Sequence, residues 1–293
     1  MAKNIPYLTL ASVLTAFMTL PLTGCVATST PRYVIDSETY QATGKSQRIK
    51  TIVLHYTVSD NERSIKTLTT GNVSAHYLIL DNDDDKIYSL VDESERAWHA
   101  GNSGFAGRTI LNDTSIGIEI VNSGIKPEYR NTLKNDELQY HPYEHFVAFD
   151  ELQIKKVAEL VQDIAKRYDI SPKNIVGHSD IAPSRKIDPG AKFPWERLHN
   201  EYGIGAWYDE FDKQFIINKN EFASATIPDI KQEFRNYGYQ INDSNEWDKA
   251  SRDVVYAFQL HFRPQRPTGV MDLETYAILR ALNKKYAGRN DFY

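Results

Sequence analysis

Alternating and clustered hydrophobic positions predict short buried strands and an amphipathic helix. Residues 115–120 alternate with a period of two, which places three isoleucines on one face of a strand. The β-branched run 52–54 and the apolar run 174–177 predict two further strands. In residues 150–168, apolar side chains recur at every third or fourth position, which is typical of a helix with one face in the core. The pattern predicts an α/β fold with a mixed central sheet flanked by helices.

The pattern becomes purely helical in the last part of the chain. Residues 229–237, 247–262 and 272–286 predict three helices with enough apolar side chains for a small core. We therefore expect an α/β domain over residues 49–215 and a small all-α three-helix domain over residues 228–288.

Composition changes this picture little. The chain has 293 residues, of which 41% are hydrophobic and 25% charged, and this is ordinary for a globular protein with one sizeable domain and a smaller one. The formal net charge of -5 gives no reason to expect nucleic-acid binding. A monomer is expected.

The N-terminus carries the only cysteine, Cys25. An uncharged stretch from Ile5 to Gly24 follows Lys3 and ends in Leu-Thr-Gly-Cys, which resembles a bacterial lipoprotein signal. This predicts a signal peptide over residues 1–24, lipidation of Cys25 and a tether over residues 25–48. By the same resemblance, Val26 implies sorting to the outer membrane, facing the periplasm. The alternative is an uncleaved membrane anchor, because the stretch is long enough to span a bilayer.

Candidate chemistry lies where the predicted strands end. His178 follows the strand at 174–177, and Asp188 lies on the same loop between two prolines that restrict the backbone. His55 ends the strand that contains residues 52–54, and Glu119 shares a strand face with small residues. Taken singly, each histidine could be a core residue and Glu119 could face solvent. Together they suit a metal site with a neighbouring carboxylate.

Five segments in this order resemble a known family: 54–57, 74–79, 97–101, 112–119 and 178–190. They are similar to the zinc-dependent N-acetylmuramoyl-L-alanine amidases of the amidase-2 type, closest to the AmiD-like outer-membrane lipoprotein amidases. The resemblance implies one Zn²⁺ bound by His55, His178 and Asp188, with Glu119 as the catalytic carboxylate and Lys186 assisting it. Lys186 could otherwise be a solvated loop residue.

The residue types fit that chemistry. Two imidazoles and one carboxylate leave one position of tetrahedral zinc open, which distinguishes a catalytic from a structural site. Glu119 would move the proton from water to the leaving L-alanine amine, and Lys186 would help to stabilise the oxyanion. The expected reaction is hydrolysis of the bond between N-acetylmuramic acid and L-alanine in peptidoglycan or muropeptides, in turnover or remodelling of the cell wall.

Two other classes of protein remain open. A non-catalytic peptidoglycan-recognition protein could share the fold, although such proteins typically lack a metal ligand or the carboxylate. A zinc peptidase would cut within the stem peptide and release a different product. The helices at 228–288 resemble a peptidoglycan-binding domain, or they form a structural cap. If they form a binding module, deletion from Pro228 onward should leave cleavage of small muropeptides largely intact.

Four further histidines and a tryptophan are weaker candidates. His76, Trp98 and His99 are candidates for substrate contact, with His76 alternatively structural and His99 the better of the two histidines. His141 and His145 have a spacing that could bind metal on a helix, but Pro142 argues against a helix. We expect their segment to form a loop over the substrate groove.

Overall fold

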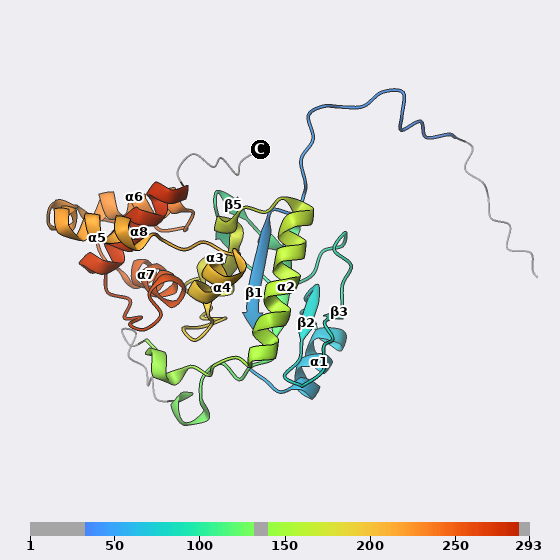
Figure 1. Cartoon of the computed structure of the whole chain (residues 1–293), viewed down its shortest axis with the longest axis horizontal. Coiled ribbons are helices and arrows are strands. Elements are labelled where there is room, and N and C mark those ends of the chain that lie inside the picture. The colour runs from blue at the N-terminus through green and yellow to red at the C-terminus, as the bar shows by residue number, and fades with distance from the viewer. Residues whose placement is uncertain (1–32, 132–139, 287–293) are drawn as a thin grey trace, which may run out of the picture. The chain divides into compact units, whose positions relative to one another are not determined.

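The computed structural model describes residues 33–131 and 140–286 (Figure 1). They belong to two compact units, one ending at Lys45 and the other beginning at Ser46. Residues 33–45 form no helix or strand and are exposed. No helix in these described ranges has the length and apolar character needed to cross a membrane. The predicted signal peptide, Cys25 and the start of the tether lie outside the described residues.

Five strands of the described chain form one mixed sheet in the order β3-β2-β6-β1-β7. Their bounds are Thr51–Tyr56 (β1), Tyr77–Ile79 (β2), Tyr88–Ser89 (β3), Ser115–Ile120 (β6) and Ile175–Gly177 (β7). Strand β1 is parallel to β6 and β7, β2 is parallel to β6, and β3 is antiparallel at the edge. Parallel central strands are covered on both faces, and all six residues of β1 are buried. The predicted α/β class and its three strands are confirmed.

Helix α2 (Glu151–Tyr168) matches the predicted amphipathic helix and lies over the sheet with its axis roughly along β1 (Figure 1). It begins at a capping box in which Asp150 accepts from the first turn while Gln153 accepts from the Asp150 amide. The remaining elements of this part are α1 (Asn61–Thr70), α3 (His178–Ile181), α4 (Trp195–Tyr202) and the hairpin of β4 (Gly104–Phe105) and β5 (Arg108–Thr109). Short 3₁₀ turns cover Leu111–Asp113, Pro127–Tyr129, Tyr143–His145, Pro172–Asn174 and Glu221–Ser224.

Residues 210–286 form four α-helices where the sequence predicts three. They are α5 (Glu210–Lys219), α6 (Ile227–Tyr237), α7 (Lys249–Phe262) and α8 (Leu273–Tyr286). The last three agree with the predicted helices to within two residues. The unpredicted helix, α5, packs against α8. The boundary expected at residue 215 therefore falls inside a continuous helix that belongs with the C-terminal group.

One hydrophobic core joins the C-terminal helices to the α/β part. Phe105 of the β4–β5 hairpin packs edge-on against Tyr237 and Tyr239, with ring centroids 6.2 and 5.5 Å apart. Trp195 of α4 stacks on His261 of α7 at 3.9 Å. All five rings are buried, so removing the C-terminal helices would expose apolar surface of the α/β part to water. We therefore expect deletion from Pro228 onward to destabilise the α/β part, and this shared core argues against the expectation that cleavage of small muropeptides stays largely intact.

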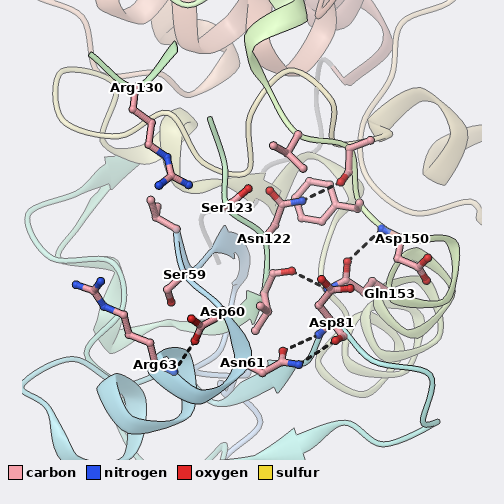
Figure 2. Close-up of a pocket in the computed structure, with 15 residues that line it drawn as sticks. Ser59, Asp60, Asn61, Arg63, Asp81, Asn122, Ser123, Arg130, Asp150 and Gln153 are labelled. Atoms are coloured by element: carbon pink, nitrogen blue, oxygen red, sulfur yellow. Dashed lines mark hydrogen bonds between the residues drawn. The ribbon is translucent and has the colours of Figure 1, made fainter. Parts of the chain in front are cut away.

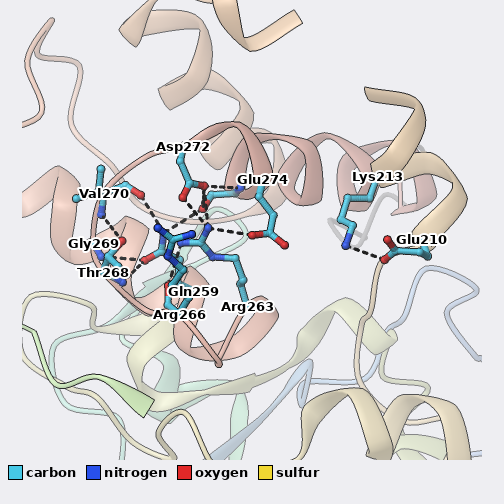
Figure 3. Close-up of polar contacts among 11 residues, drawn as sticks. Glu210, Lys213, Gln259, Arg263, Arg266, Thr268, Gly269, Val270, Asp272 and Glu274 are labelled. Atoms are coloured by element: carbon cyan, nitrogen blue, oxygen red, sulfur yellow. Dashed lines mark hydrogen bonds and ion pairs between the residues drawn. The ribbon is translucent and has the colours of Figure 1, made fainter. Parts of the chain in front are cut away.

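Buried polar groups fix the connection between α7 and α8 (Figure 3). Arg263 donates to Asp272 at 2.6 Å and to the backbone oxygen of Arg266 at 2.9 Å. Gln259 accepts from the amides of Thr268 and Gly269. Because Arg263 is only 4% exposed, its charge depends on these partners, and the loop is held in one conformation.

Candidate metal centre and active site

The three predicted metal ligands meet at the carboxyl edge of the parallel strands. The register pairs Leu54 with Gly177, so His55 on β1 and His178 just after β7 follow at neighbouring positions. Asp188 returns to them from the loop after α3, where its backbone oxygen accepts from the Ser179 amide at 2.9 Å. Glu119 is the register partner of His55 on β6, and paired residues of parallel strands share a face. The topology thus brings all four predicted side chains together.

The distances fit a tetrahedral metal site. His55 Nδ1 and His178 Nδ1 are 2.9 Å apart, and each lies 3.1 Å from Asp188 Oδ2. Ligand atoms about 2.0–2.1 Å from a tetrahedral zinc ion would be separated by about 3.3 Å. The side chains of His55, His178 and Asp188 are all buried. These three residues can hold a metal ion with little rearrangement.

A chain of hydrogen bonds settles which nitrogen of His55 is free. Ser115 Oγ donates to the Leu111 carbonyl at 2.6 Å, so it must accept from His99 Nε2–H at 3.1 Å. His99 Nδ1 is then an acceptor and receives His55 Nε2–H at 3.0 Å. The lone pair of His55 Nδ1 therefore points at His178 and Asp188. A supporting hydrogen bond of this kind orients a metal-binding histidine.

His178 is oriented in the same way by a carbonyl. Its Nε2–H donates to the Ala100 oxygen at 3.2 Å, which leaves the lone pair on Nδ1. Burial, and next the neighbouring His178, lowers the pKa of His55 from 6.5 to about 4, so this imidazole is neutral near pH 7. Burial alone would raise the pKa of Asp188, but its contacts with both histidines lower it below the ordinary range. Two lone pairs and a carboxylate converging within 3.1 Å are suited to holding a metal ion between them.

Glu119 and Lys186 border a pocket of about 530 Å³ beside these ligands. Glu119 Oε2 is buried without a hydrogen-bond partner among the described residues. Burial, and secondarily the charge of Asp188, raises the pKa of Glu119 from 4.5 to about 8, against the opposing effect of Lys186. An unpartnered carboxyl that titrates near neutral pH is suited to accepting and returning a proton. The structure places both predicted catalytic residues at the metal centre.

The three candidates for substrate contact differ in position. Trp98 lines the pocket and is 53% exposed, with the Arg96 guanidinium 4.2 Å from its ring. His99 also lines it, but its ring is held between His55 and Ser115 as described above. His76 is fully buried, and its Nδ1 accepts from the Gly117 amide at 3.0 Å. We therefore correct the substrate-binding assignment of His76, which is structural.

His141 and His145 lie away from this pocket, contrary to expectation. Their Nδ1 atoms are 3.0 Å apart, and His145 ends a 3₁₀ turn. The segment packs on α7, where Tyr256 donates to the His141 carbonyl at 2.8 Å and stacks on Tyr140. No residue between 140 and 146 lines the pocket. Proline correctly excluded an α-helix, but sequence did not reveal that a C-terminal helix covers this segment.

A buried network that the sequence did not reveal joins α7 to the metal-ligand loop. Asp180 accepts from the Gly177 amide at 2.7 Å, from Tyr239 at 2.5 Å and from His261 Nδ1 at 2.8 Å. It lies two residues after His178 and is 1% exposed. The C-terminal helices thus fix the turn that presents His178. No local pattern links Asp180 to residues so far along the chain.

The supporting role of His99 gives a direct test. The His99 ring packs against Gly117, and in His99→Phe a ring still fills this space. His55 Nε2–H, however, loses its hydrogen-bond acceptor. Loss of such a partner typically lowers metal affinity roughly 10- to 100-fold, and we expect a drop of that order. Competition with a chromophoric chelator would measure it. The matched control is His76→Phe, which removes a buried histidine that does not contact His55. Equal zinc affinities for His99→Phe and the unsubstituted protein would contradict the tautomer assignment.

An open edge of parallel strands that presents two imidazoles, a carboxylate and a poised glutamate is typical of metal-dependent hydrolases. The family model described as N-acetylmuramoyl-L-alanine amidase matches residues 45–191, and a peptidoglycan binding domain model matches residues 224–279. The chain is 39% identical to the N-acetylmuramoyl-L-alanine amidase AmiD of Escherichia coli over 279 residues, which cover 91% of this chain and 95% of that protein. The chain therefore belongs to the N-acetylmuramoyl-L-alanine amidase family.

Solved structures agree with this membership. AmpDh3 from Pseudomonas aeruginosa, in complex with an anhydromuramic pentapeptide, has a TM-score of 0.77 and 42% identity, covering 86% of this chain and 98% of that one. AmiD from E. coli, in complex with anhydro-N-acetylmuramic acid-L-Ala-D-γ-Glu-L-Lys, has a TM-score of 0.75 and 39% identity, covering 88% and 97%. The protein is an amidase that hydrolyses the bond between N-acetylmuramic acid and L-alanine, as predicted.

Proposed function

We propose that the protein is a zinc amidase acting on muropeptides, with anhydro-muropeptides as its preferred substrates. The proposal of a bound metal ion rests on one observation: two imidazole lone pairs and the Asp188 carboxylate converge in a buried site. Neutral nitrogen ligands with one carboxylate suit Zn²⁺ better than the all-oxygen sites of Mg²⁺ or Ca²⁺. The preference for anhydro-muropeptides rests on similarity to two amidases whose solved complexes contain such ligands.

Three side chains of the pocket have different roles in the proposed hydrolysis. A zinc ion held by His55, His178 and Asp188 would act as a Lewis acid, which would polarise the scissile carbonyl and lower the pKa of water. Glu119 accepts the proton of the attacking water through its unpartnered oxygen and returns it to the L-alanine nitrogen as the amide bond breaks. Lys186 lies in the same pocket and places a positive charge near the oxygen of the tetrahedral intermediate. The exposed Trp98 ring offers a flat apolar surface for the sugar.

Digestion of defined muropeptides tests this proposal. The zinc-loaded protein should convert an anhydro-muramyl tetrapeptide into anhydro-muramic acid and an intact peptide beginning with L-alanine, identified by mass spectrometry. Cleavage within the stem peptide would indicate a peptidase. Binding without cleavage would indicate a peptidoglycan-recognition protein. Faster release from intact sacculi than from soluble anhydro-muropeptides would overturn the preferred substrate and leave the reaction unchanged.

We also propose that the protein is an outer-membrane lipoprotein and that its C-terminal helices contribute to binding of peptidoglycan. The lipobox ending in Cys25 supports the first proposal. The match of residues 224–279 to a peptidoglycan binding domain supports the second.

Lipid anchoring predicts the behaviour of Cys25→Ala. The variant should move from the outer-membrane fraction to the soluble fraction, because the acyl chains that would hold it in the bilayer are no longer attached. Its amidase activity on soluble muropeptides should stay the same, since residue 25 is far in sequence from every residue of the site. Membrane fractionation with immunodetection measures where the variant is located, and release of the peptide product measures its amidase activity. A variant that still sediments with the outer membrane would contradict anchoring through Cys25.

A further inference from the structure

A further pocket, of about 700 Å³, lies next to the metal pocket (Figure 2). Segments that leave the carboxyl ends of β1, β2 and β6 form its walls, together with the start of α2. Val58, Ser59 and Arg63 line both pockets, so the two lie side by side. A peptide that leaves the metal centre past Arg63 would therefore enter this space.

Most polar side chains of this further pocket are engaged in holding the fold. Asp60 caps α1 by accepting from the Arg63 amide, and Asp150 caps α2 by accepting from the Leu152 amide. Asn122 and Gln153 bind backbone groups at 3.0 and 2.7 Å. These groups are therefore not free to select a ligand by charge.

Three charged side chains are exceptions: Arg63, Arg130 and Asp81, whose carboxylate has no hydrogen bond or ion pair among the described residues. Arg63 on α1 makes no side-chain hydrogen bond or ion pair with any residue that the structure describes. Arg130 donates only through Nε, to the Ile125 oxygen at 3.1 Å, and within the same described ranges both of its terminal nitrogens lack a partner. Figure 2 shows the two side chains on the same side of the pocket, with Asp81 and Asp150 toward the other side. Asp60 lies next to Arg63, but neither guanidinium forms an ion pair with an acidic side chain that the structure describes.

This arrangement matches one part of an amidase substrate. A guanidinium group binds carboxylates with two parallel hydrogen bonds. In a stem peptide with γ-linked D-glutamate, like the one bound by AmiD of E. coli, the α-carboxylate of that residue stays free, directly after L-alanine. The peptide leaves the scissile bond on the side opposite the sugar, and Trp98, the candidate for the sugar, does not line the further pocket.

We propose that Arg63 and Arg130 form a subsite for the carboxylates of the stem peptide, which makes the enzyme selective for peptides whose glutamate α-carboxylate is free and not amidated. This inference rests on the proposed function. Arg63, shared by both pockets, would contact the carboxylate nearer the scissile bond. Arg130 would contact one further along the peptide.

Steady-state kinetics on a matched pair of substrates test the subsite. The zinc-loaded, full-length protein would be assayed with anhydro-muramyl tripeptide and with the same compound carrying an amidated glutamate. Arg63→Gln and Arg130→Gln should each raise KM for the carboxylate substrate roughly 3- to 10-fold, because each partly exposed charge pair contributes modestly. Both kcat and zinc content should change little. For the amidated substrate, Arg63→Gln should leave KM unchanged from the unsubstituted protein.

The control is Lys66→Gln, which removes a positive charge from the exposed face of α1 without touching either pocket. If it raises KM as much as Arg63→Gln does, the effect is general electrostatic attraction and the subsite is wrong. Equal losses on the free and amidated substrates in Arg63→Gln would also overturn it. Failure of the unsubstituted protein to release L-alanyl peptides would instead refute the proposed function, so the two failures are distinguishable.

Discussion

His178→Ala and Asp188→Ala should each lose zinc, and amidase activity with it. Each removes one of three protein ligands from an open site, and Asp188 Oδ2 contacts both histidines at 3.1 Å. The affinity for zinc should fall more than about 100-fold, since even the loss of a supporting hydrogen bond costs 10- to 100-fold. Atomic spectroscopy on the purified variants, with peptide release measured in parallel, checks both effects.

The control for these two variants is Asp169→Asn, which removes an exposed negative charge at the C-terminal end of α2 without altering any of the three ligands, and asparagine tolerates the left-handed backbone conformation there. It should bind zinc normally. A stoichiometric zinc content in His178→Ala or Asp188→Ala, after dialysis against a weak chelator, would show that the cluster is not the metal site.

Glu119→Gln should keep its zinc and lose activity. The amide preserves the size of the side chain but cannot accept a proton, and a general base typically contributes about 10²- to 10⁴-fold in rate. Lys186→Ala should also keep zinc and lower kcat to a smaller degree, through weaker stabilisation of the oxyanion. Zinc content and kcat would be measured on the same preparations. A metal-free Glu119→Gln would make this residue a ligand or support, and a fully active one would remove it from the mechanism.

The raised pKa of Glu119 gives a second readout without substrate. In the unfolded chain this carboxyl titrates near 4.5, and in the folded metal-free protein near 8. As pH rises between these values, the unfolded state releases the proton first, so the free energy of unfolding decreases. Glu119→Gln lacks this group. Denaturant titrations of the metal-free proteins should therefore show the variant gaining stability relative to the unsubstituted protein from pH 5 to pH 8.

The network around Asp180 changes how the C-terminal helices are understood. A detachable binding module would contact the catalytic part through an exposed, polar interface. Here His261 and Tyr239 reach a buried carboxylate two residues from a metal ligand. Even if the helices bind peptidoglycan, they also complete the structure that holds His178.

Local sequence patterns determined the main strands and helices and identified the candidate site residues. Period-two alternation and β-branched runs predicted β1, β6 and β7, and helical periodicity predicted α2 with its boundaries, because such patterns record which neighbouring side chains share a buried face. Since His55 and His178 lie at strand ends, their place beside a loop could also be predicted. The family motifs supplied the remaining roles.

Only the tertiary structure decided how these parts meet. The parallel order of β6, β1 and β7 sets His55, Glu119 and His178 side by side, and His99 fixes the tautomer of His55 from 44 residues away. The contact between Asp180 and His261 spans 81 residues. Such contacts depend on the packing of elements that are distant in the chain, and a hydrophobic pattern records that a residue is buried without recording its partner. For the same reason the sequence left open whether the C-terminal helices form a binding module or a structural cap, whereas the shared core makes them part of the active site's support.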